Sequence, residues 1–223
     1  MYTALFLLVL YNLNMENKYA KLNDFYKNRE FEKVIKLGKS LLNENLSIDK
    51  KGHVLRIIGR ALDQLAVSIK NEIRKKEIQK EALNYFEKLK KINEFETHRG
   101  IGTIYHHQKN FKKAAKSYEK ALKINPESEM IYNDLGNAYQ RAWVLNGNQN
   151  YFNKAIEFYN QALEKSENEE TKLSPLINIA LLNKKADKNK EGKKYAEEAL
   201  KIMKEINEPA YEPFITQLRE MIN

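Results

Sequence analysis

The sequence contains no cysteine and little proline or glycine. The absence of cysteine excludes disulfide bonds and thiolate zinc sites. Only 4 prolines and 8 glycines occur in 223 residues, which favours long helices over many short strands. The chain is nonetheless 42% hydrophobic and 10% aromatic, so it has enough apolar side chains to bury a core. Its length suits one sizeable domain or two small ones.

Acidic residues are outnumbered by basic ones, which gives a net charge of +9. An excess of this sign suits acidic partners, namely nucleic acid, anionic lipid or acidic peptide. The lysines are dispersed along the whole chain, however, and dispersed lysine is typical of solvated helix faces. This second interpretation is favoured, so nucleic acid is not the expected partner.

The first fourteen residues, MYTALFLLVLYNLN, carry no charged side chain. A helix that spans a bilayer needs ~20 apolar residues, so this segment is too short to do so. Three interpretations remain open for residues 1–14: an overlong start, a helix docked on the domain, or an export signal. No Lys or Arg precedes the apolar run and no clear cleavage site follows it, which favours the first two. A cytoplasmic location is therefore expected, with export or membrane association as the alternative.

A repeat with an offset of 34 residues runs through the middle of the chain. Gly102 and Tyr105 recur as Gly136 and Tyr139. A second pattern places small and aromatic residues at spacings of four and then three, which lie on one face of a helix. This pattern occurs at Ala114/Tyr118/Ala121, Ala155/Tyr159/Ala162 and Gly192/Ala196/Ala199, and more weakly at Ala82/Phe86/Leu89 and Val34/Gly38/Leu41.

Small residues at such positions let two antiparallel helices approach closely. Gly102 and Ala114 remove bulk where the helices cross, and Tyr105 and Tyr118 fill the space beside them. Pro126 suits the turn that follows, because proline cannot continue a helix. One such hairpin cannot bury its apolar face alone, so several copies must stack.

These residues resemble the tetratricopeptide repeat family, whose period is 34 residues. The resemblance implies an all-α, right-handed superhelical solenoid of about five helix-turn-helix hairpins and a C-terminal capping helix. It predicts one domain over residues 15–223, with repeats at 16–48, 52–94, 95–128, 129–168 and 173–206 and the cap at 209–223. The fourth repeat is longer, which predicts a first helix ending near Leu145 and a loop at residues 146–150. The second repeat is longer still, and its apolar periodicity predicts extended helices.

No catalytic or metal-binding pattern accompanies the repeats. The four histidines are His53, His98, His106 and His107, and none forms a His-x-x-x-His pair. Gly100 and Gly102 lie inside a predicted helix with no strand before them, so they do not form a phosphate loop. We therefore expect no enzyme activity, no metal and no cofactor.

The resemblance implies that the first helix of each repeat lines a concave groove. Its inward face is placed from the packing glycine of each repeat, or from Ala180 in the last one. The groove residues predicted in this way are Arg56, Arg60, Arg99, Thr103, His106, Asn133, Asn137, Gln140, Ile177, Leu181 and Lys184. The resemblance adds Asn178, which, like Asn137, falls in an asparagine position of the family's peptide clamp. The groove would be basic at first, lined by amides in the middle and apolar near its end.

This groove predicts a non-catalytic protein-interaction scaffold that binds an acidic or C-terminal peptide. Arginine offers a planar fork for carboxylates, and asparagine can bond an extended peptide backbone. The lysine/asparagine/arginine clamp of some family members is not carried over, because Asn133 occupies the place of its lysine. The arginines have a second interpretation, in which they pair with Asp63 and Glu96 and solvate the surface.

An alternative function is a basic adaptor for nucleic acid or an anionic membrane surface. It would use lysines of the outer helices, such as Lys193 and Lys194. The sequence predicts no small-molecule substrate, and it does not predict an oligomeric state.

Overall fold

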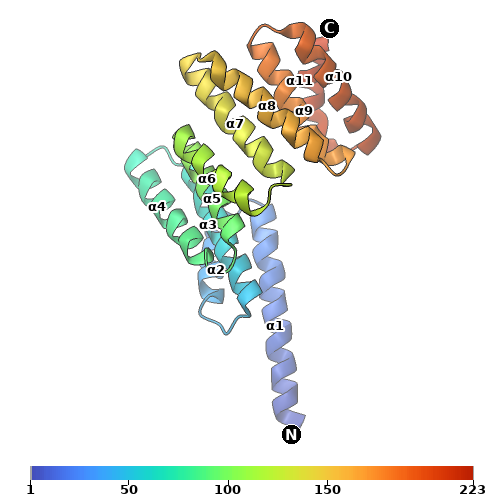
Figure 1. The fold of residues 1–223 in the computed structure, drawn as a ribbon. Coiled ribbons are helices and arrows are strands. Elements are labelled where there is room, and N and C mark those ends of the chain that lie inside the picture. Colours follow the sequence, from blue (N-terminus) through green and yellow to red (C-terminus); the bar gives the residue numbers. More distant parts are fainter. Residues whose placement is uncertain (1, 223) are drawn as a thin grey trace. The chain divides into compact units, whose positions relative to one another are not determined.

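The structure, a computed structural model, describes residues 2–222, with side-chain surroundings for residues 13–222. Within residues 2–222 the chain forms helices and no strand, which confirms the all-α class. The helices are α1 (Tyr2–Lys27), α2 (Phe31–Leu41), α3 (Ile48–Ser68), α4 (Glu72–Leu89), α5 (Glu94–His107), α6 (Phe111–Ile124), α7 (Glu129–Asn146), α8 (Gln149–Lys165), α9 (Glu169–Lys185), α10 (Asn189–Ile206) and α11 (Glu212–Ile222), with a 3₁₀ turn η1 (Pro209–Tyr211) before the last (Figure 1).

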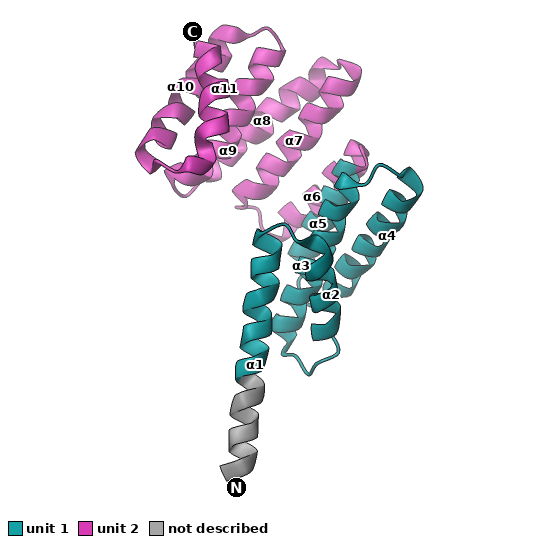
Figure 2. Cartoon of the chain, turned by 180° about the vertical axis from the view of Figure 1, so that it is seen from behind, with its two compact units in different colours: residues 1–107 teal, residues 108–223 magenta. Residues whose placement is uncertain are grey.

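The chain divides into two compact units, residues 1–107 and residues 108–223 (Figure 2). Unit 1 contains α1 to α5, and unit 2 contains α6 to α11. Within each unit, helices that follow one another pack together, most extensively α3 with α4 in unit 1 and α7 with α8 and α9 with α10 in unit 2. The division of residues 15–223 into five repeats of a single domain stays a prediction.

Three helix connections share one backbone conformation. Arg29, Lys109 and Asp187 follow the ends of α1, α5 and α9, and each has φ between 57° and 60°. Residues in this left-handed conformation end helices efficiently, although glycine is the usual choice there. Two further connections have the same conformation: the one after α7 does use a glycine, Gly147, with φ 69°, and the one after α10 uses Asn207, with φ 53°. The recurrence of one turn is what a repeated hairpin requires.

The longer helices predicted for the second and fourth repeats are present. Helix α7 ends at Asn146, one residue beyond the predicted end, and α8 already begins at Gln149, so the loop is shorter than predicted. Helices α3 and α4 are long and continuous, as the apolar periodicity predicts. The C-terminal α11 buries Leu218 in the same core cluster as Ile202 of α10.

Helix α1 continues without a break from Tyr2 to Lys27. Of its described side chains, Met15, Tyr19 and Leu22 are buried in the core of unit 1, whereas Leu13 is 57% exposed. The side chains of residues 1–12 lie outside the described residues. The three interpretations of the apolar segment therefore stay open.

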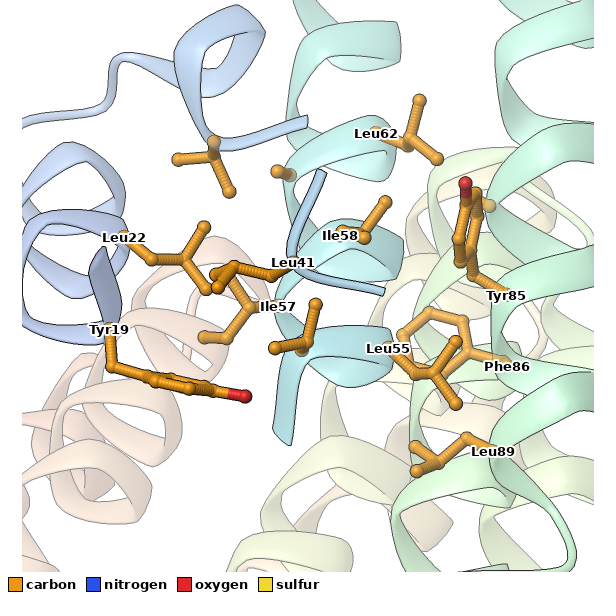
Figure 3. Close-up of a cluster of buried hydrophobic side chains, with 14 of the residues drawn as sticks. Tyr19, Leu22, Leu41, Leu55, Ile57, Ile58, Leu62, Tyr85, Phe86 and Leu89 are labelled. Carbon is orange, nitrogen blue, oxygen red and sulfur yellow. The ribbon is translucent and has the colours of Figure 1, made fainter. Parts of the chain in front are cut away.

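The core of unit 1 joins the inner faces of α1 to α4. Figure 3 shows Leu22 of α1 and Leu41 of α2 facing Ile58 of α3, with Phe86 and Leu89 of α4 on the other side of α3. All five side chains are almost completely buried. Each apolar side chain of this size contributes about 1.5–3 kcal/mol when it is fully buried.

Phe86 occupies a space that two glycines leave open. A Cβ on Gly59 of α3 would lie 2.9 Å from the Phe86 ring, and a Cβ on Gly100 of α5 would lie 2.1 Å from it. Real Cβ atoms do not approach a ring this closely, so with any larger residue either the Phe86 ring or one of the helices would have to shift. The two glycines let one aromatic ring pack against both helices.

Glycines also allow close approach within the hairpins of unit 2, against an aromatic ring in one hairpin and against the backbone in the other. A Cβ on Gly136 of α7 would lie 2.4 Å from the ring of Tyr159 in α8, and a Cβ on Gly192 of α10 would lie 3.0 Å from the carbonyl oxygen of Ala180 in α9. The glycine-and-aromatic packing predicted from the sequence is present here. Gly102 and Ala114 belong to different units, so their predicted contact stays a prediction.

We expect Gly100→Ala to destabilise the protein. Alanine is better than glycine in a helix by about 1 kcal/mol. Overpacking against Phe86 costs about 1–3 kcal/mol, so the clash should dominate and lower the melting temperature in circular dichroism. The substitution should cost much less when combined with Phe86→Leu, because the smaller side chain leaves room. An equal loss in both backgrounds would contradict the packing role of Phe86.

A chain that starts at Met15 should fold like the full chain. The buried side chains described in α1 begin at Met15, so this truncation removes none of them. A chain that starts at Ala20 also loses Met15 and Tyr19, and large apolar side chains deleted from a core cost about 2–5 kcal/mol each. Denaturant unfolding of the two truncated chains measures the difference. Aggregation of the longer one would instead indicate that residues 1–14 pack on the domain.

Candidate functional site

Three arginines from two helices of unit 1 gather at one place. Arg56 and Arg60 lie one turn apart on α3, and Arg99 lies on α5. We call these three residues the arginine cluster. Burial of the Arg60 guanidinium lowers its pKa. The positive charges of Arg56 and Arg99 lower the pKa of Arg60 further, so each of them lies near enough to Arg60 to repel its charge.

One carboxylate offsets part of this charge. The Glu96 carboxylate of α5 accepts a hydrogen bond from Arg60 Nη2 at 2.9 Å, and both side chains are half-buried. Glu96 opposes the fall in the pKa of Arg60 that burial causes. The second interpretation of the arginines, pairing with local acids, therefore holds for Arg60 with Glu96. Asp63, the other acid considered, contacts a histidine.

His53 links the arginine cluster to α1. Arg56 Nη2 donates to His53 Nδ1 at 3.2 Å, and His53 Nε2 lies 3.0 Å from the side-chain oxygen of Asn23. Because arginine can only donate, Nδ1 must accept, so this geometry requires the neutral ring with its proton on Nε2. Burial lowers the pKa of His53, and Arg56 and Arg60 lower it further.

A second polar pair joins α3 to α5. Asp63 Oδ2 accepts a hydrogen bond from His107 Nδ1 at 2.8 Å, and the other carboxylate oxygen of Asp63 is buried without a hydrogen-bond partner among the described residues. The sequence placed His106 on the groove face, but it is the neighbouring His107 that contacts α3. The Thr103 hydroxyl donates to the carbonyl oxygen of Arg99 on its own helix at 3.1 Å.

A pocket of about 350 Å³ adjoins the arginine cluster. Leu89 and Ile92 give it an apolar side, and His53, Arg56 and Glu96 give it a charged side. The remaining lining residues are Asp49, Gly52 and Asn93. Such a mixed lining can hold an apolar side chain and a charged group of one ligand at once.

Two amides of unit 2 link α7 to α9. Asn133 Nδ2 donates to Ser174 Oγ at 3.1 Å, and Asn178 Nδ2 donates to Asn133 Oδ1 at 3.0 Å. Both the nitrogen and the oxygen of the Asn133 side-chain amide therefore take part in hydrogen bonds. Among the described residues, the side-chain oxygen of Asn178 has no recorded hydrogen bond.

The other two predicted amides bind a core tyrosine. The Tyr159 hydroxyl donates to the Asn137 side-chain oxygen at 2.8 Å and also contacts the side-chain oxygen of Gln140. The Tyr159 ring is completely buried, and this burial raises its pKa. Asn137 and Gln140 thus satisfy a buried hydroxyl, a role that the sequence did not indicate.

The predicted apolar end of the groove is only partly exposed. Ile177 is 8% exposed and belongs to the core cluster of α9 and α10. Leu181 is half-buried against the same cluster, and Lys184 is exposed. The surface of α9 therefore offers Leu181 and Lys184 to a ligand more readily than Ile177.

The described part of the chain contains no group of three or more acidic or histidine side chains arranged to hold a metal ion. Among the described helices, none combines the length and the apolar character needed to cross a membrane.

Comparison with known proteins agrees with the resemblance noted in the sequence. A family model described as "TPR repeat" matches residues 102–142. No curated protein matches the chain in sequence.

Solved structures with the same fold cover most of the chain. They include TTC0263, a thermophilic TPR protein in Thermus thermophilus (15% identity, TM-score 0.64, 93% of this chain and 96% of that one). A second is BtubC (BKLC) from P. vanneervenii, with 18% identity and a TM-score of 0.62 over 93% of this chain and 81% of that one. A third is MamA 41-end from Desulfovibrio magneticus RS-1, with 20% identity and a TM-score of 0.54 over 85% of this chain and 93% of that one. The TPR match at residues 102–142 agrees with the predicted repeat at that place, and the helical solenoid fold is confirmed.

Acidification should destabilise the protein partly through His53. Its pKa is lowered in the folded state, so the unfolded chain binds the proton more readily below its own pKa of about 6.5. The contribution of His53 is fully present above that pH and is lost as the pH falls below it. Denaturant midpoints between about pH 7.5 and 5.5 should therefore fall less for His53→Gln than for the unchanged chain. Identical profiles would contradict the neutral-ring geometry.

Proposed function

We propose that this tetratricopeptide-repeat chain is a non-catalytic interaction scaffold that binds an acidic peptide segment of a partner protein. The observation that carries the proposal is the arginine cluster, in which Arg56 and Arg99 add their positive charges to that of Arg60, whose carboxylate partner is Glu96. Repeat scaffolds of this family typically bind proteins and carry no catalytic groups. A peptide ligand fits both the fold and the charge.

A ligand carboxylate would relieve the repulsion within the cluster. The Arg60 guanidinium is half-buried and already paired with Glu96, whereas the Nη2 of Arg56 donates to a neutral imidazole. Guanidinium–carboxylate hydrogen bonds are charge-assisted and about twice as strong as neutral ones. We therefore assign carboxylate binding to Arg56, with Arg99, Thr103 and His106 on α5 as further residues of the predicted groove.

The adjoining pocket suggests what lies next to the carboxylate. Its apolar side, formed by Leu89 and Ile92, would accept an aliphatic side chain one or two residues away in the peptide. Burial of such a side chain contributes about 1.5–3 kcal/mol. The preferred ligand is thus an acidic segment, or a C-terminus, with a neighbouring apolar residue.

Unit 2 offers its own polar surface for an extended backbone. The side-chain oxygen of Asn178 can accept a peptide N–H, and Asn133 holds Asn178 in place through its hydrogen bond. Leu181 and Lys184 on the same helix would contact ligand side chains. Asn137 and Gln140 contribute indirectly, because they hold the buried Tyr159 hydroxyl of α8 against α7.

Charge reversal at Arg56 and Arg99 should abolish binding of an acidic peptide. The probe is a labelled ten-residue synthetic peptide of alternating Glu and Leu, measured by fluorescence anisotropy. Losing charge pairs at an interface typically costs about 2–5 kcal/mol, so Arg56→Glu with Arg99→Glu should weaken a micromolar complex by tenfold or more. Amidating the peptide C-terminus tests whether a terminal carboxylate is part of the ligand.

The matched control reverses two lysines of α10, Lys190 and Lys194, which are exposed and have no recorded ion pair within the described residues. Lys193 is unsuitable because its Nζ donates to the carbonyl oxygen of Ile222 at 2.6 Å. The control should bind the peptide normally, and all variants should melt at similar temperatures. If the lysine variant loses binding while the arginine variant keeps it, the basic-adaptor alternative replaces the peptide scaffold.

A further inference from the structure

The connection between α3 and α4 exposes two large apolar side chains. Val67 is 50% exposed and Ile73 is 73% exposed, the highest value for a large apolar residue in the described part of the chain. Scattered exposed apolar residues are ordinary. These two, however, stand on either side of one short connection, because α3 ends at Ser68 and α4 begins at Glu72 (Figure 1).

Basic side chains surround this apolar pair. Lys70, Arg74 and Lys76 are exposed, and no ion pair is recorded for them among the described residues. Lys75 differs, since its Nζ lies 3.6 Å from the carboxylate of Glu72. Residues 67–77 contain four basic and two acidic residues, the second acid being Glu77. The surface around the apolar pair is therefore positive.

Local hydrogen bonds hold the connection in shape. The Asn71 side chain caps α4 by accepting a hydrogen bond from the Arg74 backbone N–H at 3.0 Å. The Ser68 hydroxyl donates to the carbonyl oxygen of Leu65 at 2.8 Å, and the Ile69 N–H donates to the carbonyl oxygen of Ala66 at 3.2 Å. Val67 and Ile73 are thus presented by two well-capped helix ends.

We propose that this tip, formed by Val67, Lys70, Ile73, Arg74 and Lys76, binds the surface of an anionic phospholipid membrane. Apolar side chains flanked by Lys and Arg suit the boundary between headgroups and acyl chains. Each cation near an anionic bilayer strengthens binding by about fivefold. The two aliphatic side chains add apolar contact that charge alone does not supply.

The composition of the tip favours lipid over nucleic acid. Proteins that bind single strands combine cations with aromatic rings on which bases stack. Residues 65–77 contain no aromatic residue on which a base could stack. Aliphatic side chains such as Val67 and Ile73 also have no favourable interaction with the phosphate groups of a nucleic acid. The exposed side chains of the tip are therefore complementary to a surface that is both anionic and apolar.

Unit 2 provides a matched control for apolar exposure without charge. Leu145 at the end of α7 is 63% exposed and Val144 is 38% exposed. Residues 142–153 contain no Lys or Arg. This site therefore separates the contribution of an exposed aliphatic residue from that of the combined apolar and basic tip.

The absence of cysteine makes a direct test simple. Ile73→Cys and Leu145→Cys each create one labelling position for an environment-sensitive fluorophore in the full chain. Addition of vesicles containing about 30% phosphatidylserine should shift the emission of the label at position 73 to the blue. Neither label should respond to phosphatidylcholine vesicles, and the label at position 145 should respond to neither composition.

Unlabelled variants measure the two contributions by vesicle co-sedimentation. Lys70→Glu with Arg74→Glu should weaken binding to the anionic vesicles at least tenfold, since two favourable charges become unfavourable. Val67→Ser with Ile73→Ser should weaken it about fivefold through lost apolar contact. Lys190→Glu with Lys194→Glu should leave it unchanged. Because all these positions are exposed, melting temperatures should stay the same.

Three outcomes would overturn the proposal. The first is that the unchanged chain does not sediment with anionic vesicles. The second is an equal response of the labels at positions 73 and 145. The third is that the glutamate variant loses vesicle binding while the serine variant keeps it, which would show that charge alone accounts for the binding and that the apolar pair takes no part. Arg56→Glu with Arg99→Glu should bind vesicles normally, so this test is independent of the peptide proposal.

Discussion

The packing of Phe86 against Gly59 and Gly100 determines how closely the helices of unit 1 approach one another. Since the ring fills the space that both glycines leave, α3 and α5 meet α4 at the same side chain. Helices α3 and α5 are then close enough for two polar pairs to join them, Arg60 with Glu96 and Asp63 with His107. The geometry of the arginine cluster thus depends on a contact that is entirely apolar. A substitution in this core would therefore change the positions of the charged side chains at the surface without replacing any of them.

Periodicity made most of the fold predictable, because small residues at helical spacing leave few ways to pack two helices. The end of α7 was predicted to within one residue on this basis. The left-handed turns at Arg29, Lys109 and Asp187 were not predictable from glycine, since none of these residues is glycine. The continuity of α1 across residue 15 was also missed, because a change in composition does not by itself end a helix.

The sequence could predict on which helix face the candidate site residues lie, but not which hydrogen-bond partner each side chain has. A helical register places Arg56, Arg60 and Asn137 on the first-helix face, yet it does not indicate which neighbour each side chain contacts. Whether Asn137 binds a ligand or the Tyr159 hydroxyl depends on how far a buried ring reaches across the hairpin. In the sequence, His53 is a single histidine outside any motif, so its role could not be predicted. The three-dimensional structure places it between Arg56 and α1.

The left-handed turns also bear on how this protein tolerates mutation. A residue with a side chain in that conformation costs roughly 1–2 kcal/mol relative to a right-handed one, a cost that glycine avoids. Three such positions represent a few kcal/mol in a protein whose total stability is on the order of 5–15 kcal/mol. Single changes to glycine at Arg29, Lys109 or Asp187 would offset a destabilising change elsewhere. The solenoid therefore has room to acquire new surface residues, and so new binding preferences, without losing its fold.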